Sequence, residues 1–257
     1  MSEGRISFDP CDVLDLLRSL GKKHLIHANS VITAKTFCEA FRLLSRGAVE
    51  SEGMFQTDQY TDSLDKRSGI WHDLFLNLSN QHRRFCRPNT YGPVSFSFSI
   101  DILLNFFGRV QGAKISITKI PPSDWEKPAY AGEQKWVTSL QDLAAQFDAP
   151  RRGENFFREK KGRWPDVVIS GIDGIPLNLC QTIEIETLPH DPAFFSKAKR
   201  ALLETSNGTK LLSKIQPLAC NKINCGCKDP ESFKKPELYI INANELHQGP
   251  DKAAVSE

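Results

Sequence analysis

Hydrophobic and polar residues alternate most regularly between Val94 and Ile100, where the chain reads VSFSFSI. Apolar residues occupy every second position and serines lie between them, which predicts a β-strand with one buried face and one exposed face. A Tyr-Gly-Pro turn and a polar, histidine-containing stretch that begins at Tyr60 precede this strand. Because anionic cofactors often bind where a basic segment meets the end of a sheet, we expect a ligand site in this part of the chain.

The same kinds of pattern divide the rest of the chain into helices and strands. Apolar residues at helical spacing predict helices at residues 10–20, 33–45, 139–147 and 194–203. Short apolar or alternating runs predict further strands at residues 24–30, 74–78, 113–120, 167–169, 180–187 and 236–243. Residues 48–68 are mostly polar, and we expect them to form a long loop over the site.

Composition indicates a folded chain with one main domain. Of the 257 residues, 40% are hydrophobic and 25% are charged, which is enough for a sizeable core. We expect one domain at residues 1–217 and a cysteine-containing extension at residues 218–257 that packs on it. The net charge of +2 is too small to indicate nucleic-acid binding unless basic residues gather in a local patch.

The chain lacks the usual signals of a membrane or secreted protein. No apolar run approaches the roughly 18 residues that a membrane-spanning helix needs, and no signal peptide precedes Asp9. The seven cysteines are an odd number and most are scattered, which indicates reduced thiols and no disulfide framework. We therefore expect a cytoplasmic protein with no membrane partner.

Two segments carry side chains suited to binding an anionic cofactor. His24 and His27 lie three positions apart on a predicted strand, so they face opposite sides. His27 would donate a hydrogen bond to a ligand if it points into a cleft; otherwise both are surface or capping histidines. Arg67 lies between Asp65 and Trp71 in the sequence, and its planar guanidinium would bind a pyrophosphate better than lysine does. The alternative for Arg67 is a solvated charged run.

Four motifs in order resemble the DarT family of DNA-targeting ADP-ribosyltransferases: LIHANS, a helix that ends near Gly47, YTDSLDKR and WHDLFLNLSNQHRR. The resemblance covers roughly residues 20–190. It implies an α+β fold with a split, mostly antiparallel sheet and flanking helices, like the NAD-binding core of ADP-ribosyltransferases. It also implies a nicotinamide-side motif, an NAD-contacting loop and the start of a core strand, formed respectively by His27, Asn29 and Ser30, by Tyr60, Asp62 and Arg67, and by His72 and Asp73.

The same pattern implies a catalytic carboxylate at the start of a later strand. The family has Glu at this position, and the matching residue here is Asp166, which is one methylene shorter. Glu154 or Glu159 would replace it in another strand register. A carboxylate suits the reaction because breaking the bond to nicotinamide builds positive charge on the ribose, and a carboxylate stabilises that charge. Asp in place of Glu puts catalysis in doubt, but not NAD binding.

These features together predict an enzyme that transfers ADP-ribose from NAD to nucleic acid, with a base in single-stranded DNA as the favoured acceptor. Arg67 and Asp166 would be its catalytic residues. By the resemblance, the protein would be a toxin or phage-defence effector, and its partners would include an antitoxin or a hydrolase that reverses the modification.

Two other functions fit the same residues. Asp166, Glu184 and Glu186 have the order found in restriction-type nucleases, where such carboxylates bind Mg²⁺. Alternatively, Glu184 and Glu186 form the wet face of an edge strand. The second alternative is a degenerate NAD-fold module that binds but no longer catalyses, which the change from Glu to Asp166 suggests.

A cysteine-rich segment near the C-terminus raises the question of zinc. Cys220, Cys225 and Cys227 lie in CNKINCGC, which lacks the paired Cys-x2-Cys knuckles of a typical zinc site. A fourth ligand is not obvious, although His247 or Cys180 could supply it. We therefore expect a reduced, turn-rich loop without zinc.

Overall fold

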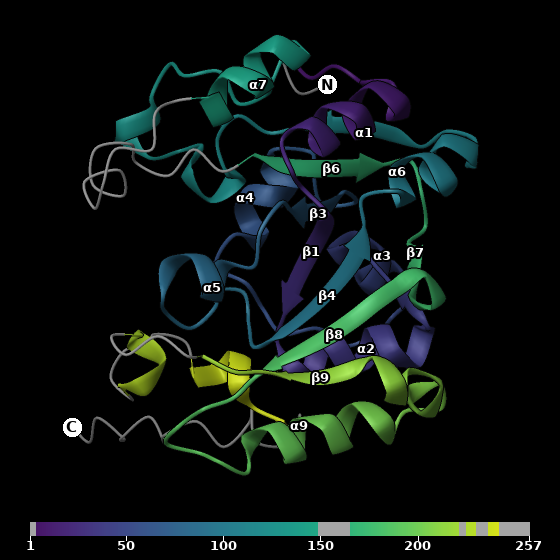
Figure 1. The fold of residues 1–257 in the computed structure, drawn as a ribbon, viewed down its shortest axis with the longest axis vertical. Helices are drawn as coiled ribbons and strands as arrows, with labels where there is room; N and C mark the ends of the chain where they lie inside the picture. Colours follow the sequence, from purple (N-terminus) through teal and green to yellow (C-terminus); the bar gives the residue numbers. More distant parts are fainter. Residues whose placement is uncertain (1–3, 149–164, 221–224, 230–235, 242–257) are drawn as a thin grey trace, which may run out of the picture.

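The computed structural model describes residues 4–148, 165–220, 225–229 and 236–241. A seven-stranded sheet forms its core, with strand order β5-β6-β3-β1-β4-β8-β9 (Figure 1). Its strands are β1 His24–Asn29, β3 Leu74–Asn77, β4 Val94–Ser99, β5 Lys114–Ile117, β6 Asp166–Ser170, β8 Cys180–Glu186 and β9 Ile215–Leu218. Neighbours in this sheet are antiparallel except β8 and β9, which are parallel. A second sheet pairs β2 Arg42–Leu43 with β7 Ile175–Pro176.

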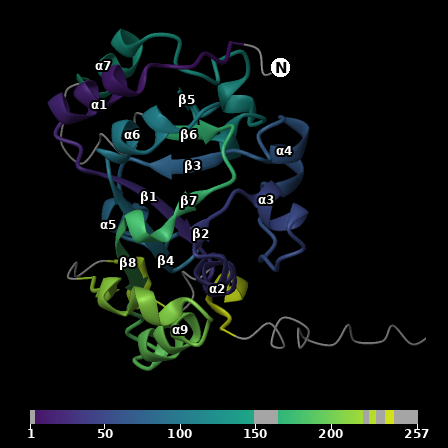
Figure 2. The ribbon, with the colours of Figure 1, turned by 90° about the vertical axis from the view of Figure 1, so that its right-hand side faces the viewer.

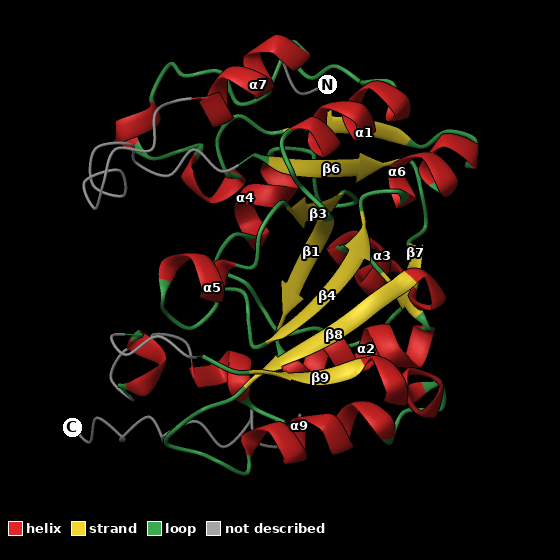
Figure 3. Cartoon of the chain, in the orientation of Figure 1, coloured by secondary structure: helices red, strands yellow, loops and turns green. Residues whose placement is uncertain are grey.

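Helices gather at the two ends of the large sheet and beside its middle. The α-helices are α1 Pro10–Ser19, α2 Val31–Ala40, α3 Arg46–Ser51, α4 Asp62–Arg67, α5 Gln81–Phe85, α6 Ile102–Asn105, α7 Leu140–Asp148 and α9 Phe194–Leu203. Short 3-10 helices are η1 Phe107–Arg109, η2 Pro122–Asp124, η3 Pro128–Tyr130, η4 Leu177–Leu179, η5 Gly208–Lys214, η6 Gly226–Lys228 and η8 Pro236–Tyr239. Figure 3 shows α1 and α7 near β6, and α2 and α9 near β9. Figure 2, a quarter turn away, shows α3 and α4 together. The fold is therefore α+β, with a mostly antiparallel sheet and flanking helices.

Side-chain caps start the helices next to the middle strands. The hydroxyl of Ser30 accepts a hydrogen bond from the amide of Thr33 at 3.1 Å, and Ser45 accepts one from Ala48 at the same distance. Each cap satisfies an amide that has no partner within the helix. The caps hold the neighbouring residues Asn29 and Arg46, and both of these line the cavity described below.

The structure corrects several sequence-based boundaries. The helix expected at residues 33–45 ends at Ala40, because Phe41 adopts a left-handed conformation (φ 52°) and the chain turns into β2. The loop expected at residues 48–68 contains the end of α3 and all of α4. The strand expected at residues 236–243 begins instead with a 3-10 helix. By contrast, the helix expected at residues 194–203 is α9, with the same bounds.

Strand β4 is buried on both faces, so the expectation of one exposed face was wrong. Ser95 and Ser97 are 2% and 7% exposed, and the apolar residues between them are buried as well. The start of α5 covers the serine face. Asn80, just before α5, and Arg83 within it both donate hydrogen bonds to the side chain of Glu184 on the neighbouring strand β8, and Glu184 lies opposite Ser95. Small serines leave room for this layer.

Strand β8 is also not the edge strand that the sequence suggested, because β9 pairs with it. Glu184 and Glu186 are 7% and 1% exposed.

Among the described residues, no helix is long and apolar enough to cross a bilayer.

Candidate functional site

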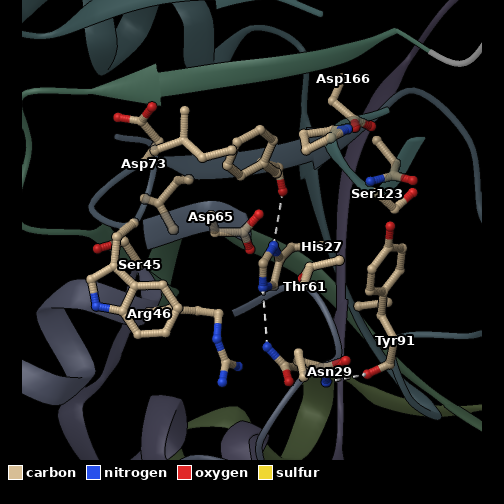
Figure 4. Close-up of a pocket in the computed structure, with 18 of the residues that line it drawn as sticks. His27, Asn29, Ser45, Arg46, Thr61, Asp65, Asp73, Tyr91, Ser123 and Asp166 are labelled. Atoms are coloured by element: carbon tan, nitrogen blue, oxygen red, sulfur yellow. Dashed lines mark hydrogen bonds between the residues drawn. The ribbon is translucent and has the colours of Figure 1, made fainter. Parts of the chain in front are cut away.

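A cavity of about 830 Å³, including the open space at its mouth, lies where β1, β3 and β6 come together, and its lining is more apolar than polar. Strand pairing builds one wall, because Asn77 on β3 pairs with both Ile26 on β1 and Asp166 on β6. The remaining lining comes from the start of α3, from α4 and the residues before β3, from Tyr91 and from Ser123 (Figure 4).

His27 lies in the cavity with both ring nitrogens engaged. Its Nδ1 lies 2.8 Å from the carbonyl oxygen of Phe75, and a carbonyl only accepts, so Nδ1 carries a proton. Burial lowers the pKa of His27, and the nearby charge of Arg46 adds to this effect. The ring is therefore neutral at pH 7, and Nε2 accepts a hydrogen bond from the side-chain nitrogen of Asn29 at 3.4 Å. A ligand could donate to Nε2 only in place of Asn29, whereas the sequence suggested that His27 would donate a hydrogen bond.

Arg46 provides the positive charge of the cavity. Its Nη2 donates to a carboxylate oxygen of Asp62 at 2.6 Å and to the carbonyl of Thr57 at 3.1 Å, and its guanidinium lies over the ring of Trp71. The side chain is 17% exposed. Its Nε and Nη1 are buried and have no hydrogen-bond partner in the protein. Buried donors without partners are costly, so this guanidinium is suited to an anion that would satisfy them.

Further polar atoms near Arg46 also lack partners. They are Oε1 of Gln59, which lines the cavity, and Oδ1 of Asp62, the carboxylate that holds Arg46. Such unsatisfied groups are rare in protein interiors. Arg46, Gln59 and Asp62 place several of them beside this cavity.

Asp166 begins β6 and is 7% exposed. Its backbone is fixed by two hydrogen bonds with Thr118, one in each direction. Burial raises the pKa of the Asp166 carboxyl to about 7. Figure 4 shows it near Tyr91 and Ser123. Burial also raises the pKa of Tyr91, and the charge of Asp166 contributes to that rise.

A second carboxyl in the cavity is perturbed in the same direction. Burial raises the pKa of Asp65 to about 6, against the opposing effects of a hydrogen bond from Thr61 and the charge of Arg46. Asp73 also lines the cavity, but its carboxylate pairs with Arg5 at 2.6 Å. Carboxyls with raised pKa values in a cavity are typical of functional sites.

The cavity gathers some of the residues selected from the sequence. His27, Asn29, Asp73 and Asp166 line it. Ser30 is buried beside it, where it caps α2 and bonds to Thr57 at 2.8 Å.

Other selected residues lie outside the cavity lining. Arg67 is 58% exposed and pairs with Glu126 at 2.9 Å. Tyr60 is 57% exposed. The ring of His72 packs against Gly47 at the surface. Glu154 and Glu159 lie outside the described residues.

Arg46 is the main residue that sequence reasoning missed. The sequence pattern predicts one helix at residues 33–45, whereas the structure has the short strand β2 followed by a new helix that starts with Arg46. A signal was available, because Ser45 is a favoured capping residue and marks a helix start. Tyr91 and Asp65 were also not selected.

The structure separates the three carboxylates of the nuclease hypothesis. Asp166 lies on β6, whereas Glu184 and Glu186 lie on β8, with three strands between them. Neighbouring strands are about 4.8 Å apart, so the two groups are separated by about 19 Å, far too much to share a metal ion. Glu184 is instead paired with Arg83 at 2.6 Å. The described residues therefore do not form the expected magnesium site.

Gly92 allows the backbone of the cavity to close tightly. A Cβ atom at this position would lie 2.3 Å from the backbone carbon and oxygen of Asn29, and φ is +132°. We expect Gly92→Ala to lower the free energy of unfolding by about 2–4 kcal/mol and to weaken ligand binding, because it must displace Asn29. Gly132→Ala is a matched control, since Gly132 also has a positive φ but open space around it. Urea unfolding of both variants checks this; equal losses would show that the close approach is unimportant.

No protein-family model matches the chain, and no curated protein is significantly similar to it in sequence. The chemistry of the cavity is therefore what indicates a function.

Proposed function

We propose that the protein transfers ADP-ribose from NAD to a nucleic acid, with a base in single-stranded DNA as the acceptor, in a site of the ADP-ribosyltransferase type. One observation carries the proposal: a buried guanidinium with two unpartnered nitrogens and a buried carboxyl line the same cavity. NAD needs both, because it has an anionic pyrophosphate and a ribose that becomes positively charged when nicotinamide leaves.

Arg46 would bind the pyrophosphate. Its Nη2 is held by Asp62, and Nε and Nη1, whose N–H groups point in different directions, remain as separate donors for phosphate oxygens. His27 would bind the nicotinamide end, where Nε2 would accept a hydrogen bond from the carboxamide N–H in place of the one from Asn29.

Asp166 would act at the ribose. The bond between ribose C1′ and nicotinamide breaks, and its electron pair leaves with nicotinamide. The acceptor base then forms a bond to C1′ and loses a proton, which Asp166 can take. A base whose pKa is near the working pH is suited to this task, and the pKa of Asp166 is raised to about 7.

A smaller hollow supports a nucleic-acid acceptor. It also reaches Asp166, and its other walls include Gln81, Arg84 and Phe85 of α5. Aromatic and arginine side chains beside a reactive group are typical of sites that bind single-stranded nucleic acid, because bases stack on them. The net charge of the whole chain is too small to indicate nucleic-acid binding, but the basic and aromatic residues of α5 would form a local patch for it.

The direct test is to incubate the purified protein with labelled NAD and single-stranded DNA, without added metal. We expect the label to appear on the DNA and nicotinamide to be released in equal amounts. The rate should rise as pH increases through about 7, because Asp166 accepts a proton only when ionised. DNA cleavage that requires Mg²⁺, with no NAD consumed, would overturn the proposal. Double-stranded DNA, RNA and protein serve as alternative acceptors in the same assay.

NAD binding without transfer is the second candidate. The raised pKa of Asp166 favours it, because a carboxyl that is largely neutral below pH 7 stabilises positive charge poorly. In that case NAD should raise the melting temperature, but no nicotinamide should be released at pH 8 with any acceptor. An antitoxin or reversing hydrolase as partner stays a prediction of the family resemblance.

A further inference from the structure

Four potential metal ligands converge where α5 meets the cysteine motif near the C-terminus. His82 on α5 meets Cys220, Cys225 and Cys227, and one ligand atom from each lies within 4.8 Å of all the others. His82, Cys225 and Cys227 are 2%, 3% and 0% exposed. We propose that these four residues bind a structural zinc ion that joins α5 to the segment after β9.

The distances suit tetrahedral zinc. With zinc–sulfur and zinc–nitrogen bonds of about 2.3 and 2.0–2.1 Å, a tetrahedral site places its ligand atoms about 3.4–3.8 Å from one another. The Nε2 of His82 lies 3.5 Å from the sulfur of Cys225. A small contraction of the other pairs would complete the site. Three thiolates and an imidazole select zinc over magnesium or calcium, which prefer oxygen ligands.

A buried carboxylate orients the histidine. The Nδ1 of His82 lies at ion-pair distance, 2.8 Å, from Oε1 of Glu186, although the pair lacks hydrogen-bond alignment. This contact leaves Nε2 directed toward the thiols. Glu186 is itself held by the amide of Asn89 at 3.0 Å and by the hydroxyl of Tyr239 at 2.7 Å. A carboxylate behind a ligating histidine is the usual outer layer of a zinc site.

The backbone supports the same arrangement. The amide of Gly226, between the last two cysteines, donates to the carbonyl of Cys86 just after α5 at 2.8 Å. The seven cysteines all lie in described residues and form no disulfide. Cys180, the other candidate ligand from the sequence, instead bonds to the carbonyls of Ser97 and Thr182. His247 lies outside the described residues.

The site is closed and structural in type. Four protein ligands fill a tetrahedral zinc ion and leave no position for water or substrate. Its effect is on α5, a five-residue helix that is too short to be stable by itself. The helix also carries Arg84 and Phe85 of the hollow at Asp166. The metal would therefore fix one wall of that hollow, but it would bind whether or not the protein uses NAD.

Metal analysis tests the proposal directly. The full chain is produced in zinc-containing medium and purified without a chelator or a metal-affinity step. We expect about one equivalent of zinc per chain, and less than about 0.2 in a Cys225→Ser, Cys227→Ser double variant. Cys180→Ser is the matched control, since it removes a buried thiol outside the cluster, and it should keep its zinc. Wild-type protein without zinc or another transition metal, or a double variant with a full equivalent, would overturn the proposal.

A spectroscopic measurement covers the case in which the variants fail to fold. Wild-type protein is stripped of metal and titrated with Co²⁺ alone. We expect the intense visible bands of tetrahedral cobalt and near-ultraviolet charge transfer from thiolates, saturating at about one equivalent. Metal removal should speed hydrogen exchange at α5 and residues 225–229 but not at α1, which packs on α6 and α7. A weak octahedral spectrum would contradict thiolate ligation.

Discussion

Arg46→Ala should abolish most NAD binding and lower the transfer rate by about 100-fold or more, the cost typical of removing one preoriented contact to a developing or fixed negative charge. The reason is that Arg46 is the guanidinium in the cavity lining, with two donors that no protein group satisfies. The first measurement is the rise in melting temperature caused by millimolar NAD, which should nearly vanish. The second is nicotinamide release.

Two control variants make this result specific. Arg46→Lys keeps the charge beside Asp62 but loses the planar fork, so it should fold normally and bind NAD weakly. Arg67→Ala should leave NAD binding close to that of the wild type, because Arg67 is exposed and pairs with Glu126. The opposite ranking of the Arg46 and Arg67 variants would show that Arg67, as the sequence pattern predicts, and not Arg46 binds the pyrophosphate.

Asp166→Asn should abolish transfer while NAD still raises the melting temperature. Asparagine has nearly the same shape as aspartate but can neither stabilise the charged ribose nor take a proton. Losing the carboxylate therefore affects the transition state more than NAD binding. Asp166→Glu should keep activity, since it restores the residue of the resembling family. An Asp166→Asn protein with undiminished transfer would contradict the catalytic role.

Asp166→Asn should also raise the free energy of unfolding above neutral pH, relative to the wild type. The pKa of Asp166 is raised from 3.8 to about 7 by burial, so the folded state holds this proton more tightly than the unfolded state. The contribution of the Asp166 carboxyl to the free energy of unfolding is therefore fully present below about pH 4, and it is lost as pH rises to about 7. The loss is on the order of 4 kcal/mol as an upper bound, from about 1.4 kcal/mol per pKa unit.

Urea unfolding at pH 5 and pH 8 checks this sign. Asp166→Asn has no such titration, so its advantage over the wild type should be larger at pH 8 than at pH 5. Asp65, whose pKa is raised to about 6, contributes in the same direction in both proteins and cancels in the comparison. If the wild type lost no more stability than the variant between these two pH values, the carboxyl would not be buried as the structure has it.

Local sequence determined much of the secondary structure of this protein. The periodicity that predicted α9 and β8 needs only neighbouring residues, and both elements lie where it indicated. The capping role of Ser30 is local as well. These features are readable from the chain because a helix face or a strand face repeats every few residues.

Tertiary structure alone decided which polar residues meet. Arg46 and Asp166 line one cavity although 119 residues lie between them, and Glu186 and Asp166 lie far apart although both are carboxylates on strands of one sheet. His82 joins three cysteines from the other end of the chain. Periodicity specifies which face of a strand is apolar, but not which strand becomes its neighbour, because strand order depends on contacts between residues distant in sequence. The candidate site and the metal ligands depend on that order, so neither could be assembled from the sequence by itself.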